Sequence, residues 1–93
     1  MQLRASWKTA SVEVIEAKIE QLIGEIYDVD VASLNEETNF YRDLDDSLEI
    51  VETVMRCEEE FGIELPDEET SAQNIETVRE FKNYIVAKIR TRD

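Results

Sequence analysis

One serine stands among carboxylates in the stretch DLDDSLEIVETVMRCEEEF, residues 43–61, where a polar segment gives way to an amphipathic one. The hydroxyl of this residue, Ser47, can act as a nucleophile, cap a helix, or receive a group that another enzyme attaches. A nucleophilic serine needs a general base, yet the chain has no histidine and no Gly-x-Ser-x-Gly motif. The lysines closest to it along the chain are Lys18 and Lys82. We therefore expect no catalytic residue in this protein.

Two roles then remain for Ser47. As a helix cap it competes with Asp46, because an aspartate caps a helix about as well as a serine does. A phosphate-bearing group attached to the hydroxyl, by contrast, would lie at a helix N-terminus, where exposed N–H groups favour an anion. The pattern therefore favours a hydroxyl that another enzyme modifies.

The neighbouring carboxylates do not match a cation-binding loop. An EF-hand needs oxygen ligands at positions 1, 3 and 5, glycine at position 6 and glutamate at position 12. Counted from Asp43, position 6 is Leu48 and position 12 is Val54; counted from Asp28, position 5 is Ala32. We expect no dedicated metal site, only weak and non-specific binding of divalent cations to the acidic surface.

Residues 47–61 predict a helix with distinct faces when they are placed at about 100° per residue. The apolar, core-facing side consists of Ile50, Val51, Val54, Cys57 and Phe61. The opposite, charged side consists of Glu49, Glu52, Arg56, Glu59 and Glu60. Leu48 and Met55 lie at the margin, where they either cover the edge of the core or anchor a partner beside the acidic side.

The formal net charge of −13 is concentrated around this helix. Between Asp43 and Glu69, twelve acidic residues and one basic residue contribute −11. Such a charge disfavours binding to nucleic acid and to anionic membranes, and it complements basic surfaces on other proteins. A solvated acidic face without a partner is the alternative.

The chain of 93 residues predicts one small domain, residues 11–93, after a loose extension, residues 1–10, whose Trp7 can pack back on the domain. Scarce glycine and proline argue against a β-sandwich or barrel. A single cysteine, Cys57, forms no internal disulfide, and neither an apolar run of transmembrane length nor a signal peptide is apparent. We expect a soluble, monomeric protein of the cytoplasm.

Apolar spacing and capping residues predict an all-α fold. The first helix begins after Ser11, its N-cap, and keeps its apolar residues on one face as far as Ile26. A long loop, residues 27–46, separates it from the second helix, which Gly62 ends.

Two further helices complete the predicted bundle. Asp67 caps a short third helix of one or two turns, and Thr77-x-x-Glu80 is a capping box for the last helix. These elements predict a four-helix bundle with three longer helices, a short third helix and a long loop between the first two.

Two segments carry a family resemblance: DSLEIVETVMRCEEEFGIELPDEE, residues 46–69, and NIETV at the start of the last helix. They resemble the acyl carrier proteins of dissociated (type II) fatty-acid and polyketide synthases. An isolated Asp-Ser-Leu triplet is a weak signal, but the triplet with this acidic helix, this ending and this helix spacing is specific. The resemblance covers roughly residues 11–90 and implies the same four-helix bundle that the residues alone predict.

By this resemblance, Ser47 is the serine to which a phosphopantetheinyl transferase attaches 4′-phosphopantetheine from coenzyme A, and the thiol of that arm carries acyl groups as thioesters. Asp46 corresponds to the acidic residue that presents the serine, and Leu48 to an apolar residue that flanks the arm. Acyl-transfer and condensing enzymes with basic patches are the implied partners of the second helix. The implied partner-binding residues are Glu49, Val51, Glu52, Met55, Glu58 and Glu59.

The chain departs from the family pattern in its ten-residue extension with Trp7, which is unusual, and in three further places. DLDDSL is one residue shorter than the common spacing, Arg56 stands where a small neutral residue is common, and Cys57 replaces a larger aliphatic one.

A carrier of apolar cargo needs an interior that can open. We expect that interior around Val51, Val54, Cys57, Phe61, Leu65 and Phe81.

Three functions remain open. The first is an acyl carrier that presents thioesters to enzymes of fatty-acid or polyketide-type biosynthesis. The second is an aminoacyl or peptidyl carrier of a dedicated secondary pathway, which would use the same serine but have a less acidic second helix. The third is an acidic helical adaptor without a prosthetic group. The acidity of residues 43–69 favours the first.

Overall fold

The computed structural model describes residues 4–44, 47–70 and 74–91, and of residues 4–6, 47 and 48 it describes the backbone alone. Within these residues every regular element is helical, and the one β-bridge, between Asn39 and Thr77, joins two positions outside any strand. The predicted all-α class is confirmed. The elements are η1 (Arg4–Thr9), α1 (Val12–Tyr27), η2 (Val31–Ser33), α2 (Ser47–Phe61), η3 (Asp67–Glu69) and α3 (Val78–Thr91).

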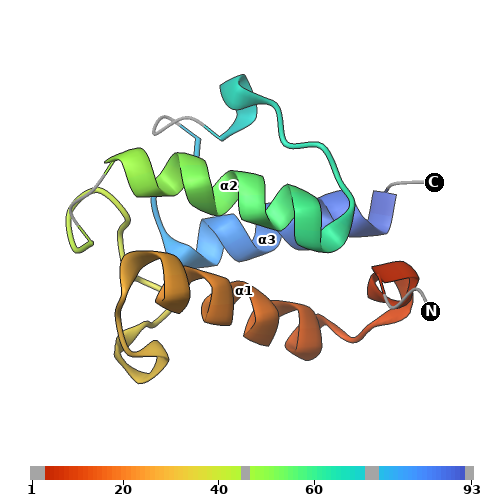
Figure 1. Cartoon of the computed structure of the whole chain (residues 1–93), viewed down its shortest axis with the longest axis horizontal. Coiled ribbons are helices and arrows are strands. Elements are labelled where there is room, and N and C mark those ends of the chain that lie inside the picture. Colours follow the sequence, from red (N-terminus) through yellow and green to blue (C-terminus); the bar gives the residue numbers. More distant parts are fainter. Residues whose placement is uncertain (1–3, 45–46, 71–73, 92–93) are drawn as a thin grey trace.

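Helix α1 packs against both α2 and α3 (Figure 1). Helix α1 runs opposite to α2 and α3, and η1 lies at the end of the bundle where α2 and α3 finish. The 3-10 turn η3 lies beside α2, in the connection from α2 to α3. The three longer helices of the predicted bundle are therefore present, and the short third helix is a single 3-10 turn among the described residues.

Local chemistry explains where α1 and α2 begin and end. The N–H of Val14 donates to Oγ of Ser11 at 3.3 Å, so the predicted N-cap is confirmed. Helix α1 ends at Tyr27, and its C-cap is Asp28, a non-glycine residue in the left-handed region with φ 57° and ψ 48°. Gly62 follows α2 with φ 66°, a conformation that glycine adopts without strain, as predicted.

The capping box at the start of α3 is present in both directions. The N–H of Glu80 donates to Oγ1 of Thr77 at 3.2 Å, and the N–H of Thr77 donates to Oε1 of Glu80 at 3.2 Å. The N–H of Glu76 donates to the same carboxylate oxygen at 2.7 Å. These backbone hydrogen bonds, that of Glu76 above all, lower the pKa of Glu80.

The predicted cap of the short helix is wrong. Asp67 is the first residue of η3 rather than its cap, and the cap position belongs to Pro66, which makes no side-chain hydrogen bond there. The extended backbone of Pro66, with φ −61° and ψ 144°, leads the chain directly into the turn. The expected continuation of this helix to Ala72 lies in part at residues 71–73, outside the described residues.

One face of each α-helix and the long loop build the core. Its fully buried side chains include Ile15, Ile19, Ile23, Phe40, Cys57, Phe61, Phe81, Ile85 and Ile89. Val51, which the helical wheel assigned to this face, is 56 % exposed, so that assignment is wrong. Helical spacing predicts the centre of the apolar face of α2. How many residues on either side of that centre are buried depends on the elements that pack against the helix.

The long loop is anchored against the start of α3. Phe40 has no exposed surface, and its ring meets that of Phe81 edge to face at 5.6 Å. The N–H of Phe40 donates to the carbonyl of Glu76 at 2.8 Å, and the N–H of Val78 donates to the carbonyl of Thr38 at 2.9 Å. Backbone hydrogen bonds and the contact between the Phe40 and Phe81 rings therefore both fix the loop against the start of α3.

A buried lysine ties the same loop to α1 and α3. Lys82 is only 3 % exposed, and its Nζ donates to Glu20 at 2.5 Å and to Glu36 at 2.7 Å. Burial opposes the charged form of Lys82, but the hydrogen bonds to the two carboxylates outweigh it and raise its pKa. Sequence periodicity does not predict these two ion pairs, because Glu20, Glu36 and Lys82 come from α1, the long loop and α3.

The N-terminal segment packs on the end of the bundle. The rings of Trp7 and Phe61 meet edge to face at 4.8 Å, which confirms that Trp7 packs back on the domain. The Arg90 guanidinium donates to the carbonyls of Lys8 at 2.9 Å and Ala10 at 3.1 Å. Within residues 4–10 the expected loose extension is thus a packed 3-10 turn, and the division of the chain at residue 10 stays a prediction.

Candidate functional site

The candidate site begins at the N-terminus of α2. The backbone of this helix starts at Ser47, as the sequence predicts. The side chains of Ser47 and Leu48 are outside the described set, and Asp46 lies outside the described residues. The first N–H groups of a helix lack acceptors within it, so this position favours an attached anion.

A hydrogen-bonded turn approaches the start of α2. Oδ1 of Asn39 accepts from the N–H groups of Tyr41 at 2.8 Å and Arg42 at 2.9 Å, and the N–H of Asp43 donates to the Asn39 carbonyl at 2.8 Å. Arg42 donates to Asp43 through Nε at 3.0 Å and Nη2 at 3.1 Å. Hydrogen bonds from Arg42, and then from the Asn39 backbone, lower the pKa of Asp43. The turn therefore has a defined shape just before the serine.

A pocket of about 540 Å³ opens between α2 and the segment that contains η3. Ile50, Val54 and Leu65 are almost completely buried and form its apolar floor. Val51 and Met55 line it too, but they are 56 % and 57 % exposed and so belong to its rim. The polar members of the lining are Tyr41, Glu58, Asp67 and Thr70.

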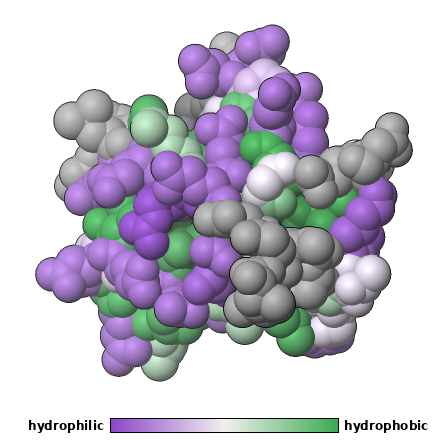
Figure 2. Space-filling model, turned by 45° about the vertical axis from the view of Figure 1, so that its right-hand side comes forward, coloured by the Kyte–Doolittle hydropathy of each residue, from purple (hydrophilic) through white to green (hydrophobic). Residues whose placement is uncertain are grey.

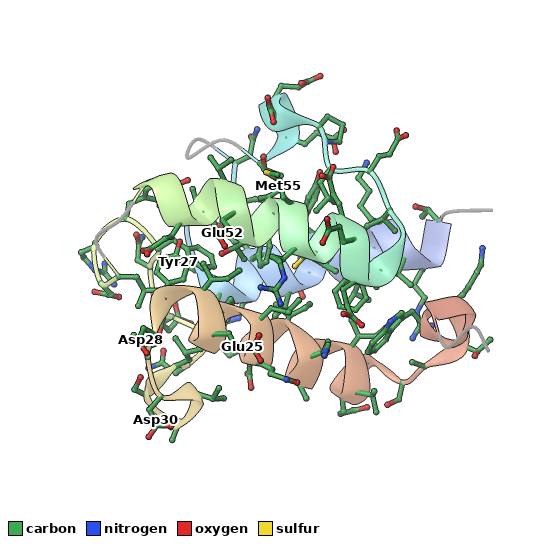
Figure 3. All side chains as sticks on the ribbon, viewed as in Figure 1. Glu25, Tyr27, Asp28, Asp30, Glu52 and Met55 are labelled. Atoms are coloured by element: carbon green, nitrogen blue, oxygen red, sulfur yellow. The ribbon has the colours of Figure 1, made fainter. Side chains whose placement is uncertain are left out.

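The pocket lies directly along the helix from the predicted modification site. Ile50 and Val51 are one helical turn beyond Ser47, and Val54 and Met55 follow one turn later. In Figure 3, Met55 extends from α2 toward η3, whereas Glu52 lies on the side of α2 nearer α1. The arrangement can shelter an apolar chain that starts near the N-terminus of α2 and runs along it.

Charged side chains form a separate face of α2 beside the pocket. Glu52 and Glu59 are exposed and two turns apart, on the face next to the Val51 and Met55 rim. Arg56, between them, donates to Oε1 of Glu25 on α1 at 3.4 Å, so its charge is partly neutralised within the molecule. One face of the molecule in Figure 2 is largely hydrophilic, with small apolar patches between the polar side chains. Exposed carboxylates beside exposed apolar groups suit a basic protein partner.

Two of the predicted partner-binding carboxylates are less exposed. Glu49 is half-buried near the start of α2. Glu58 is also half-buried, and its Oε2 accepts from the N–H of Leu65 at 2.8 Å, which fixes the chain just before η3. Glu58 therefore has a structural role that sequence reasoning did not foresee, and its predicted role in partner binding stays a prediction.

Cys57 belongs to the core and not to the pocket. It has no exposed surface, and burial, followed by the nearby Glu60 charge, raises the pKa of its thiol to about 12. A thiol with that pKa stays protonated at neutral pH and behaves as a small apolar group. Of the expected plastic interior, Val51, Val54 and Leu65 line the pocket, whereas Cys57, Phe61 and Phe81 are core residues outside its lining.

Sequence reasoning missed three residues of the lining. Tyr41, Asp67 and Thr70 lie in non-periodic segments on either side of α2 in the chain, so no helical pattern groups them with Ile50 and Val54. The Pro-Asp-Glu-Glu stretch after Leu65 was part of the resemblance, and it was the only available signal that this segment belongs beside α2.

In the residues that the structure describes, neither a membrane-spanning helix nor a metal-binding cluster is found. None of the helices in the described part of the chain combines the length and apolar character needed to cross a bilayer. The described residues also contain no cluster of three or more cysteine, aspartate or glutamate side chains placed to hold a metal ion.

Comparisons with known proteins agree on one family. The family described as "Phosphopantetheine attachment site" matches residues 17–85. The chain is 46 % identical over 76 residues to an acyl carrier protein of Lactobacillus acidophilus, which covers 81 % of this chain and 92 % of the relative. It is 43 % identical over 75 residues to that of Rubrobacter xylanophilus, covering 80 % and 90 %. It is 49 % identical over 72 residues to that of a Picosynechococcus species, covering 76 % and 86 %.

Proposed function

Because the chain belongs to the acyl carrier protein family and contains its phosphopantetheine attachment domain, we propose that Ser47 bears the 4′-phosphopantetheine of this protein. The proposed function is to carry acyl groups and to present them to enzymes of fatty-acid or polyketide-type biosynthesis. Acyl carrier proteins are carriers and not catalysts. The observation that supports this function best is the apolar pocket that starts one turn along α2 from Ser47.

The residues present fit a phosphate-linked arm at this place. The N-terminus of α2 offers backbone N–H groups that favour a phosphodiester on the first residue of the helix. The rim formed by Val51 and Met55 offers apolar contacts farther along the same helix. When bound, the arm supplies a terminal thiol that holds the acyl group as a thioester.

The pocket supports fatty-acyl cargo in particular. Its volume of about 540 Å³ falls within the usual range of ligand pockets, about 300–1,000 Å³. Each methylene that leaves water contributes about 0.8 kcal/mol, so a chain on the floor of Ile50, Val54 and Leu65 is stabilised in proportion to its length. The floor of Ile50, Val54 and Leu65 offers no polar side chain, so a polar aminoacyl or peptidyl group gains less from contact with it than a hydrocarbon chain does.

The partner surface of the proposal is the acidic face of α2. We assign Glu52 and Glu59 to electrostatic contact with basic patches of the phosphopantetheinyl transferase and of the acyl-transfer and condensing enzymes. Val51 and Met55 supply the apolar anchors beside them. Asp46 and Leu48, on either side of the serine, are proposed to contact the transferase and the arm.

Mass spectrometry after incubation with coenzyme A and a broad-specificity transferase tests the assignment. The wild type should gain the mass of one phosphopantetheine, and Ser47→Ala should gain none. Ser33→Ala is the matched control, because Ser33 lies on η2, away from α2, and should leave the mass gain intact.

The outcomes separate the three candidate functions. A wild type that gains no mass supports the adaptor without a prosthetic group and refutes the carrier. A Ser47→Ala variant that still gains mass refutes the site. If the modified protein is loaded with aminoacyl and not with fatty-acyl groups by cognate enzymes, the peptidyl-type carrier replaces the fatty-acyl one.

A further inference from the structure

Two acidic residues from different elements line the pocket beside α2. Glu58 reaches it from α2, and Asp67 reaches it from η3. Glu58 is held in place, since its Oε2 accepts from the Leu65 N–H at 2.8 Å. The rest of the polar lining is uncharged and consists of Tyr41 and Thr70. A group that enters the pocket therefore meets two negative charges from different elements.

Among the described residues, no positive charge balances these carboxylates within the lining. The pocket-lining residues that the structure describes include no lysine or arginine. The basic side chains near its walls are engaged elsewhere: Arg42 with Asp43 at 3.0 Å and Lys88 with Glu69 at 2.9 Å. Arg56, on α2 itself, turns to Glu25 of α1 at 3.4 Å.

A carboxylate cargo would need the opposite arrangement. Proteins bind carboxylates with arginine, lysine or several N–H donors, because the charge must be compensated when water is removed. In the described part of this pocket the floor is apolar and the charged side chains are acidic, so a carboxylate meets both desolvation and repulsion. A neutral hydrocarbon chain meets neither.

We propose that Glu58 and Asp67 make the pocket selective by charge: it admits neutral acyl chains and excludes acyl groups that end in a carboxylate. This inference rests on the proposed carrier function and specifies the substrate class of its pocket. Half-thioesters of dicarboxylic acids are then held on the arm outside the pocket, exposed to enzymes and to water, while hydrocarbon chains of the same length are sheltered.

The test compares three six-carbon cargoes on the full-length modified protein. Hexanoyl is neutral and apolar, adipoyl ends in a carboxylate, and adipamoyl ends in an uncharged amide of nearly the same shape. Amide-linked arms prevent hydrolysis during the measurement. Methyl NMR of Ile50, Val54 and Leu65, which form the pocket floor, reports the seated fraction of each chain.

The variants separate local charge from net charge. Glu58→Gln with Asp67→Asn removes both pocket charges, and the amide oxygen introduced by Glu58→Gln can still accept from the Leu65 N–H. Glu13→Gln with Glu16→Gln removes the same number of charges from α1, outside the lining and outside the proposed partner surface, and is the matched control.

In the wild type, we expect hexanoyl to shift the floor methyls and adipoyl to be seated at least about tenfold less, with adipamoyl between them. The pocket variant should raise the seated fraction of adipoyl several-fold and leave hexanoyl unchanged, whereas the control variant should change neither. Equal seating of adipoyl and hexanoyl in the wild type overturns the inference. So does a pocket variant without effect, or a control variant that restores adipoyl equally well.

Failure of the underlying function gives different results. If the wild type gains no phosphopantetheine mass, both the carrier function and the inference are overturned. If the protein is modified and loaded but hexanoyl leaves the floor methyls unshifted, the charge filter is overturned while the carrier function stands.

Discussion

Loading the protein with acyl groups of two to eight carbons should raise its melting temperature as the chain lengthens. Six added methylenes correspond to about 5 kcal/mol if all of them leave water, at about 0.8 kcal/mol each. The pocket is open along Val51 and Met55, which are 56 % and 57 % exposed, so about half of that gain, roughly 2–3 kcal/mol, is realistic. For a domain of this size, about 1 kcal/mol moves the melting temperature by about 4–8 °C. The expected rise is therefore about 10–20 °C.

The assay follows unfolding by circular dichroism at 222 nm with amide-linked acetyl, butyryl, hexanoyl and octanoyl arms, because burial of the chain favours the folded state. Val54→Phe fills the pocket floor and should flatten the dependence on chain length. Val14→Phe adds the same side chain on α1, where residue 14 is 53 % exposed and far from the lining, and should leave the slope unchanged. A flat response in the wild type would refute burial of the acyl chain in this pocket.

The remaining predictions concern partners, the loop and pH. Glu52→Lys with Glu59→Lys should slow acyl transfer by cognate enzymes at low salt much more than at high salt, while each change alters the free energy of unfolding by no more than about 0.5 kcal/mol; a parallel loss of helix content would contradict this. Lys82→Ala should lower the free energy of unfolding in urea by about 2 kcal/mol, less than the roughly 3–5 kcal/mol for fully buried pairs, because its partner carboxylates are partly exposed. Lys82→Met, which keeps the apolar stem but removes the ammonium, should lose most of the same free energy, and a variant as stable as the wild type would argue against the ion pair. Hydrogen bonds from Lys88 and Tyr84 lower the pKa of Glu69 in the folded state. The ionised carboxylate therefore stabilises the fold at pH values above the pKa that Glu69 has in the unfolded chain. This stabilisation is lost as the pH falls through the lower pKa of the folded state. Glu69→Gln should therefore lose less stability on acidification than the wild type, and identical acid profiles would contradict this.

The sequence by itself determines the helices and most of their ends. The apolar stripe of α1, the Ser11 cap and the capping box of Thr77 and Glu80 depend on contacts within four residues along the chain. Gly62 likewise ends α2 because of its own backbone freedom. Such local interactions have the same energy wherever the helix docks, so a pattern in the sequence predicts them.

The residues around Ser47 marked the candidate site in the sequence, and the resemblance gave a role to its hydroxyl and to the helix after it. The start of α2 at that residue agrees with the prediction. The chemistry at the hydroxyl and the partner-binding role of the acidic residues stay predictions, because they depend on molecules outside this chain.

The tertiary structure alone decided which side chains of α2 are covered and which line the pocket. Val51 belongs to the apolar stripe of its helix yet is exposed, because no neighbouring element in the described part of the chain covers that part of α2. Lys82 is charged yet buried, because α1 and the long loop bring two carboxylates to it. Tyr41 and Asp67 meet at one pocket although the whole of α2 separates them in the chain. Burial and charge compensation depend on distances between segments, and those distances are set only when the helices pack together.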